Sequence, residues 1–185
     1  MSYKLICFDV DGTLVKSWTD ELLPGVADKI TDLASTRLAL AIVTNQGGVG
    51  LRHWMRVGGF GDPDAMNLPY QNDIGTRITH LGRKLGVNNV YVAMAYQSKK
   101  TGEWSPVPES YGDGLVCGDD GFYKEHWGPQ WRKPAIGMIM QAMKDNNTLP
   151  NETLMVGDSP EDEQAARAAK IDFMWADEFF GRKDA

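Results

Sequence analysis

Two aspartates stand two positions apart at the end of a short apolar stretch, Asp9 and Asp11 in "LICFDVDGTLV". We expect Leu5–Val10 to form a strand, and side chains two positions apart in a strand point to the same side. Two such carboxylates repel each other, and burial raises the cost of ionising both. The pair therefore needs a cation, a shared proton or a solvated edge. Taken alone, the stretch is also compatible with a polar strand end at which Asp-Gly makes a turn.

Polar residues follow two further apolar stretches. The run "LALAIV" leads into residues 44–46, which are Thr-Asn-Gln, and "TLMVG" leads into Asp158 and Ser159. In an open parallel sheet, binding sites form beyond the carboxyl ends of the strands. Three strand ends that carry polar groups therefore predict one shared site rather than three unrelated turns.

Strand and helix signals alternate along the chain, which predicts an α/β fold: a doubly wound, mostly parallel, Rossmann-like sheet with helices on both faces. Residues 47–69 show no clear period, and we expect at most one helical turn there, at Arg52–Val57. Pro134 is expected in the first turn of its helix. The predicted strands cover residues 5–10, 38–43, 89–96, 153–158 and 171–175, and the predicted helices cover 26–35, 71–85, 134–144 and 160–170.

Composition places the chain among ordinary globular proteins. It has 185 residues, 42% of them hydrophobic and 24% charged, and we expect one domain over residues 1–185. The net charge of −6 argues against a broad basic surface for non-specific nucleic-acid binding. We find no signal peptide and no apolar run long enough to span a bilayer, so we expect a cytoplasmic protein without a membrane partner.

Residues 97–131 interrupt the alternation and are expected to form an irregular insertion. The segment is rich in Gly and Pro and holds Trp104, Trp127 and Trp131 together with several lysines. Aromatic side chains mixed with bases can stack on nucleobases and contact phosphates. The alternative, which we favour, is that these aromatics form the insertion's own small core.

Four motifs together resemble the haloacid dehalogenase-like (HAD) phosphatases: "DVDGT" at 9–13, "VTNQGG" at 43–48, "WRKP" at 131–134 and "VGDSPED" at 156–162. The "TNQ" and "RKP" details are most similar to the branch with histidinol-phosphate phosphatase, heptose bisphosphate phosphatase and the 3′-phosphatase domain of polynucleotide kinase. The resemblance spans nearly the whole chain. Neither irregular segment is long enough for a large cap domain.

The resemblance implies a role for each motif residue. Asp9 would be the nucleophile that forms an aspartyl-phosphate, and Asp11 the general acid and then the base. Thr44 and Lys133 would complete the catalytic set by contacting and neutralising the phosphoryl group.

The same resemblance implies the residues around this catalytic set. Asp9, the Asp11 carbonyl and Asp158 would bind Mg²⁺. Asn45 and Arg132 would contact the substrate beside Thr44 and Lys133. Thr13 would orient Asp11, and Asp162 would either hold Lys133 or serve only as a first-turn helix acid.

The implied function is Mg²⁺-dependent hydrolysis of a phosphomonoester, either a small phosphorylated metabolite or nucleotide or a nucleic-acid 3′-phosphate end. Phosphotransfer and non-catalytic phosphate binding on the same fold are further alternatives. Heptose phosphatases of this branch carry a zinc loop with three cysteines and a histidine before "RKP", whereas residues 97–131 offer only Cys117 and His126. Two ligands cannot close a tetrahedral zinc site, so we expect no structural zinc and doubt a heptose bisphosphate substrate. The sequence identifies no protein partner.

Overall fold

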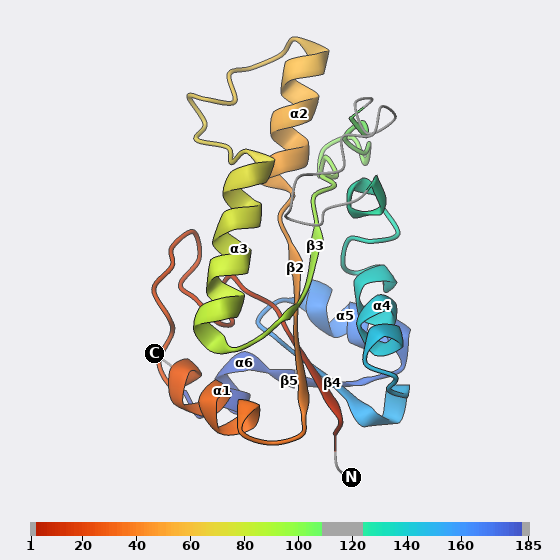
Figure 1. The fold of residues 1–185 in the computed structure, drawn as a ribbon. Helices are drawn as coiled ribbons and strands as arrows, with labels where there is room; N and C mark the ends of the chain where they lie inside the picture. The colour runs from red at the N-terminus through yellow and green to blue at the C-terminus, as the bar shows by residue number, and fades with distance from the viewer. Residues whose placement is uncertain (1–2, 109–123, 183–185) are drawn as a thin grey trace.

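A five-stranded parallel sheet organises the chain in the computed structural model, which describes residues 3–108 and 124–182 (Figure 1). The strand order β3-β2-β1-β4-β5 places the first strand at the centre. This is the doubly wound arrangement expected from the alternation of strands and helices. The strands are β1 (Leu5–Phe8), β2 (Ala39–Asn45), β3 (Asn89–Ala93), β4 (Thr153–Gly157) and β5 (Asp172–Trp175).

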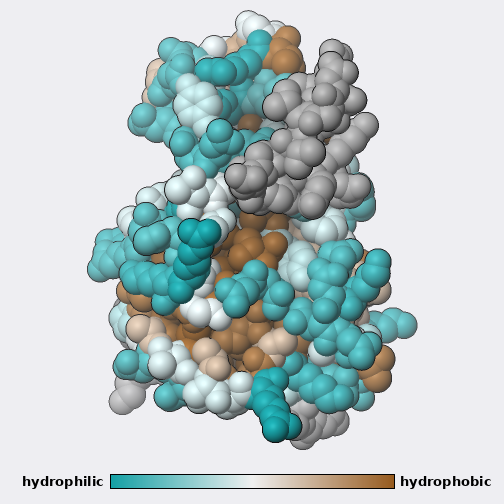
Figure 2. All heavy atoms as spheres, in the orientation of Figure 1, coloured by the Kyte–Doolittle hydropathy of each residue, from teal (hydrophilic) through white to brown (hydrophobic). Residues whose placement is uncertain are grey.

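Helices cover both faces of the sheet, as predicted. One face packs against α1 (Val26–Ala34), α3 (Gln71–Leu85) and α6 (Ala176–Phe180), and the other against α4 (Gly137–Asp145) and α5 (Pro160–Ala169). Figure 2 shows mostly hydrophilic side chains over α3 and α4, with hydrophobic ones gathered between the two helices. The helix α2 (Gly48–Gly58) and the 3-10 turns η2 (Lys124–Trp127) and η3 (Pro150–Glu152) complete the described elements.

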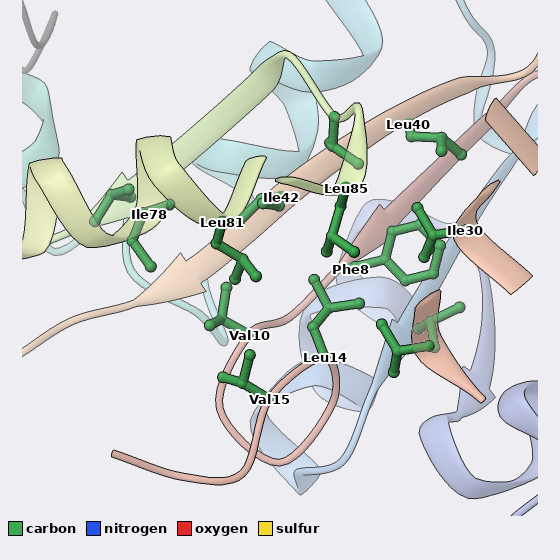
Figure 3. Close-up of a cluster of buried hydrophobic side chains, with 14 of the residues drawn as sticks. Phe8, Val10, Leu14, Val15, Ile30, Leu40, Ile42, Ile78, Leu81 and Leu85 are labelled. Carbon is green, nitrogen blue, oxygen red and sulfur yellow. The ribbon is translucent and has the colours of Figure 1, made fainter. Parts of the chain in front are cut away.

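The sheet has a hydrophobic core on each face, because side chains along β1 alternate between the two faces. Ile6 and Phe8 belong to the core under α1 and α3, whereas Leu5 and Cys7 belong to the core under α4 and α5. In the first core Phe8 packs among branched side chains of β2 and α3 (Figure 3). This central strand is buried on both faces, so the residue that follows it, Asp9, has a firmly fixed backbone.

Three elements differ from the sequence-based expectation. The predicted single turn at Arg52–Val57 is a helix of three turns, α2, whose period was obscured by glycines. A Cβ at Gly50 would lie 2.4 Å from the Met94 carbonyl oxygen, so close packing against the end of β3 requires glycine there. The short helix α6 was not predicted.

The helix predicted from Pro134 begins instead at Gly137. The Gly137 N–H donates to the Gln130 carbonyl 3.1 Å away and so belongs to a loop closure that precedes the helix. The Lys133–Pro134 peptide bond is cis. Lys133 therefore lies in a loop before α4 and not at the start of the helix.

None of the helices within residues 3–108 and 124–182 combines the length and the apolar character that a membrane span requires.

Candidate active site

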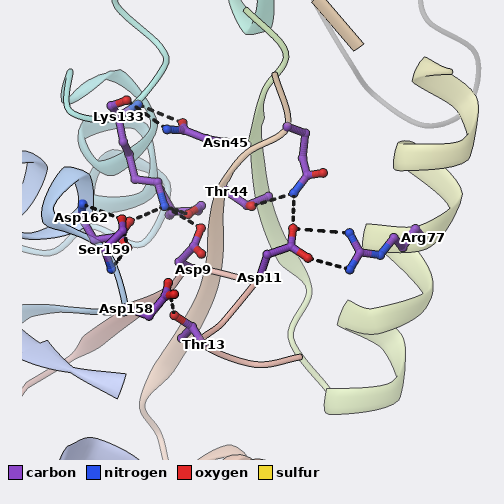
Figure 4. A network of polar contacts seen from close by, with 12 residues as sticks. Asp9, Asp11, Thr13, Thr44, Asn45, Arg77, Lys133, Asp158, Ser159 and Asp162 are labelled. Carbon is purple, nitrogen blue, oxygen red and sulfur yellow. Dashed lines mark hydrogen bonds and ion pairs between the residues drawn. The ribbon is translucent and has the colours of Figure 1, made fainter. Parts of the chain in front are cut away.

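The polar residues predicted at three strand ends lie together at the carboxyl edge of the sheet (Figure 4). The parallel register pairs Phe8 with Ile42 on one side and with Val156 on the other, so the residues that follow these three strands meet at one place. A cavity of about 220 Å³ opens there. It is lined by Asp9, Asp11, Thr44, Asn45, Arg132, Lys133, Asp158, Ser159, Glu161 and Asp162.

Lys133 forms the electrostatic centre of this cavity. Its side chain is buried, and its Nζ lies 2.6 Å from Asp9 Oδ1 and 2.6 Å from Asp162 Oδ1. Burial by itself would lower the pKa of Lys133, but the two carboxylates outweigh burial and raise that pKa above its usual value. Lys133 is therefore a cation held between the first and last carboxylates of the site.

The backbone of Lys133 is fixed by Asn45. The Asn45 Nδ2 donates to the Lys133 carbonyl at 2.9 Å, and the Lys133 N–H donates to Asn45 Oδ1 at 3.0 Å. The ammonium of Lys133 also donates to the Val43 carbonyl at 2.8 Å. The end of β2 thus positions a loop residue almost ninety positions later. Asn45 was predicted to contact the substrate through its backbone N–H, and its side chain has a separate task, which is to hold Lys133.

Asp162 fills both roles that the sequence left open. Its Oδ1 pairs with Lys133, while its Oδ2 accepts from the Ser159 N–H at 3.1 Å and from the Ser159 hydroxyl at 2.7 Å. Ser159 is the N-cap of α5, so the same carboxylate closes a capping box. A Cβ at Gly157 would lie 2.5 Å from this side chain, which makes glycine necessary just before the turn.

Asp158 lies at the exposed mouth of the site, beside the turn of the first motif. The Thr13 hydroxyl donates to Asp158 Oδ1 at 3.3 Å. Thr13 was predicted to orient Asp11, but the partner of its hydroxyl is Asp158, which directly follows β4. Gly12 has a φ of +83°, and a Cβ there would lie 2.0 Å from Asp158 Oδ2. Only glycine lets the first-motif turn approach Asp158 this closely.

Asp11 points away from Lys133 and is held by residues that were not predicted. Its Oδ1 pairs with Arg77 Nη2 at 2.9 Å, and its Oδ2 accepts from Gln46 Nε2 at 3.0 Å. Burial alone would raise the pKa of Asp11, but the hydrogen bonds from Arg77 and Gln46 outweigh burial and lower that pKa. Gln46 could have been predicted as a site residue because it follows Asn45 at the end of a strand. Arg77 could not, because its only local feature is its place on an amphipathic helix.

The carboxylates that line the cavity outnumber its cations, Lys133 and Arg132, so the site has negative charge that a metal ion could balance. Asp9, Asp158 and Asp162 each offer an oxygen within 4.8 Å of the others, and Lys133 is the ammonium among them. Burial raises the pKa of Asp9 to about 7 despite Lys133, and burial together with Asp162 raises the pKa of Asp158. Because Asp162 is engaged by Lys133 and Ser159, Asp9 and Asp158 are the carboxylates available to a hard divalent cation.

Thr44 and Arg132 are the remaining predicted substrate contacts, and both line the cavity. The buried Thr44 hydroxyl oxygen accepts from Gln46 Nε2 at 3.1 Å, so its proton is free to point elsewhere. Arg132 donates to the Ala95 carbonyl at 3.3 Å, and burial lowers its pKa. Within the described residues no carboxylate lies within ion-pair distance of Arg132, which leaves its guanidinium available to an anion.

The described aromatics of the 97–131 insertion are mostly structural. Trp127 is buried in the first core, His126 stacks on Trp131 with ring centroids 5.1 Å apart, and Trp131 Nε1 donates to the Val92 carbonyl at 3.0 Å. These aromatics are structural, as the favoured interpretation held, but they pack onto the two main cores rather than into a separate core of the insertion. Trp104 is half-buried and lines a second cavity beside the site. Cys117 lies outside the described residues.

Comparisons with known proteins agree with this geometry. The model of the haloacid dehalogenase-like hydrolases matches residues 121–176. A D-glycero-beta-D-manno-heptose-1,7-bisphosphate 7-phosphatase of Haemophilus influenzae is 26% identical over 175 residues, which are 91% of this chain and 78% of that protein. The family-model match and these relatives support a HAD superfamily phosphatase, the class that the four motifs predicted.

Two further relatives resemble the chain, one over a short stretch of sequence and one over most of the fold. The enzyme of the same name from Pasteurella multocida is 52% identical over 40 residues, but this alignment spans only 22% of each protein. The crystal structure of a D,D-heptose 1,7-bisphosphate phosphatase from B. bronchiseptica, complexed with magnesium and phosphate, has a TM-score of 0.57. It is 21% identical and covers 92% of this chain and 78% of that chain, so it supports the fold alone. All three relatives are, by name, heptose bisphosphate phosphatases. The sequence of this chain, in contrast, predicts no zinc loop of the kind expected in that branch.

Proposed function

We propose that this HAD-superfamily chain is a Mg²⁺-dependent phosphomonoesterase that acts on a small phosphorylated metabolite through an aspartyl-phosphate on Asp9. The observation that carries the proposal is the Asp9–Lys133 pair at 2.6 Å. It places a carboxylate nucleophile on a rigid strand end, next to a buried cation that can balance charge on a phosphoryl group.

The proposed reaction has two displacements at phosphorus. In the first, an Asp9 oxygen forms a bond to phosphorus while the ester P–O bond breaks, and Asp11 gives a proton to the departing alkoxide. In the second, Asp11 takes a proton from water as the water oxygen attacks phosphorus. The bond between Asp9 and phosphorus then breaks, which releases inorganic phosphate, frees the Asp9 carboxylate and leaves Asp11 protonated for the next cycle.

The other site residues would stabilise the charge that moves in these steps. Lys133 faces the nucleophile, and Thr44 has a free hydroxyl proton on the opposite side of Asp9 in Figure 4. A bound Mg²⁺ would neutralise phosphoryl charge as a Lewis acid, and Asp9, Asp158 and the Asp11 carbonyl would hold it. Asn45 and Asp162 would keep Lys133 in place from either end.

Three observations bear on the substrate. Arg132 has no carboxylate partner within residues 3–108 and 124–182 and lines both the 220 Å³ cavity and its neighbour, which favours a compact ligand with anionic groups. The relatives act, by name, on a sugar bisphosphate. Trp127 and Trp131 pack inside the protein, so they give no support to the alternative of a nucleic-acid 3′-phosphate end. A small sugar phosphate is therefore the leading substrate class.

The test is phosphate release from a panel measured with Mg²⁺ and with EDTA. The panel holds heptose bisphosphate, other sugar phosphates, histidinol phosphate, 3′- and 5′-nucleotides and a 3′-phosphorylated oligonucleotide. We expect Mg²⁺-dependent release that favours sugar phosphates and is absent in Asp158→Asn. A preference for the oligonucleotide would replace the proposed substrate class. No release from any ester by a folded, Mg²⁺-loaded protein would favour non-catalytic phosphate binding, and transfer to a second hydroxyl would indicate a phosphotransferase.

A further inference from the structure

Each carboxylate of the "DVDGT" motif has a cation of its own. Lys133 pairs with Asp9, and on the other side of the motif Arg77 pairs with Asp11 (Figure 4). The two Arg77 contacts are Nη2 to Oδ1 at 2.9 Å and Nη1 to Oδ2 at 3.5 Å. A guanidinium that reaches both oxygens restrains the rotation of a carboxylate as well as its position.

Two more donors complete the restraint on Asp11. Gln46 Nε2 donates to Oδ2 at 3.0 Å, and the Trp18 N–H donates to Oδ1 at 3.1 Å. The three residues that donate come from α3, from the loop after β2 and from the turn after the first motif. Asp11 is thus held from three separate parts of the fold.

Arg77 is itself fixed and lies behind the cavity. Its Nη2 donates to the Thr19 carbonyl at 2.7 Å and its Nε pairs with Asp20 at 3.0 Å. The neighbouring residue Ile78 is fully buried in the first core, which anchors this turn of α3. Asp11 lines the 220 Å³ cavity, whereas Arg77 does not, which places Arg77 behind Asp11 as seen from the cavity.

We propose that Arg77 is a positioning residue: it holds the ionised Asp11 carboxylate in place between turnovers, and so sets where Asp11 stands when it takes up the proton that it gives to the leaving oxygen. This inference rests on the proposed function, in which Asp11 is the proton donor. Proton transfer requires the two heavy atoms to come within hydrogen-bond reach, so a carboxylate free to rotate loses much of its effect. Arg77 then matters most for an ester whose leaving group needs a proton.

The test compares two esters that differ in this need. An alkyl phosphate leaves as a strongly basic alkoxide, whereas p-nitrophenyl phosphate leaves as a stable phenolate. The ratio kcat/KM is measured for both because it reports the steps up to the first irreversible one, before water enters. The variants are Arg77→Gln and Arg77→Lys, with Asp11→Asn as the reference pattern. Arg83→Gln on the exposed side of the same helix is the matched control for a lost charge.

We expect Arg77→Gln to lower kcat/KM for the alkyl phosphate by about tenfold or more and for p-nitrophenyl phosphate by less than about threefold. Arg77→Lys should recover part of the alkyl activity, and Arg83→Gln should match the wild type. Equal losses on both esters, or no loss, would overturn the positioning role. If the wild type hydrolyses neither these esters nor any sugar phosphate, the proposed function itself falls, and the inference falls with it.

Discussion

The Asn45 side chain and the Lys133 backbone form a pair of reciprocal hydrogen bonds, 2.9 Å and 3.0 Å long, between the end of β2 and the loop before α4. This pair explains how a lysine from an irregular segment reaches the nucleophile on β1. The loop supplies the ammonium, and the strand end sets where that ammonium points.

Asn45→Ala should therefore damage the site without removing a charge. It leaves a backbone N–H and a carbonyl of Lys133 without their partner, at a cost of about 1–3 kcal/mol in the free energy of unfolding. We expect kcat to fall at least about tenfold as Lys133 loses its alignment with Asp9. Urea unfolding and phosphate release measure the two effects, and Asn151→Ala on the exposed η3 turn is the control. An unchanged kcat would show that the loop holds Lys133 without Asn45.

Lys133→Met should be severely destabilising because it leaves Asp9 and Asp162 as buried carboxylates without their shared cation. The expected cost is about 3–5 kcal/mol near neutral pH, smaller at acidic pH, where Asp9 is protonated. The double variant Lys133→Met, Asp162→Asn should regain much of the stability and none of the activity. Urea unfolding with and without the second substitution measures this coupling. Additive losses in the double variant would contradict a direct ion pair.

Mg²⁺ binding should depend on pH through Asp9. Burial raises the pKa of Asp9 to about 7, so the folded, metal-free protein binds this proton more tightly than the unfolded chain does. The stability that this proton contributes is present at low pH and is lost as pH rises toward 7. Below about pH 7, Mg²⁺ can bind the Asp9 carboxylate only by displacing the proton. The rise in Tm caused by Mg²⁺ should therefore be larger at about pH 8 than at about pH 5.5. Asp158→Asn should reduce the rise at both pH values, and a rise independent of pH would contradict competition at Asp9.

Cys7 should be inert in the folded protein. It lies fully buried on the central strand, and burial raises its pKa to about 12. In a Cys117→Ser background, a thiol reagent at mildly alkaline pH should label Cys7 only as the chain unfolds, so the labelling rate should follow the urea dependence of unfolding. Rapid labelling without urea would mean that β1 is more accessible than the structure indicates.

The sequence predicted the sheet because its strands are short apolar runs that need cover on both faces, and the polar residues after β1, β2 and β4 predicted where the site lies. It did not predict α2, because glycines that allow close packing hide a helical period. Arg77 was missed for a different reason. Its partner Asp11 lies 66 positions away, and nothing in the local pattern of α3 separates a positioning arginine from a solvated one.

The most direct test of the account is to find the phosphoryl group on Asp9. The protein is mixed with Mg²⁺ and its preferred sugar phosphate, quenched in acid within one turnover and digested for mass spectrometry. We predict one phosphoryl group on the peptide that contains Asp9, absent with EDTA and absent, together with turnover, in Asp9→Asn. Turnover that persists in Asp9→Asn, or a phosphoryl group on another residue, would contradict nucleophilic catalysis by Asp9.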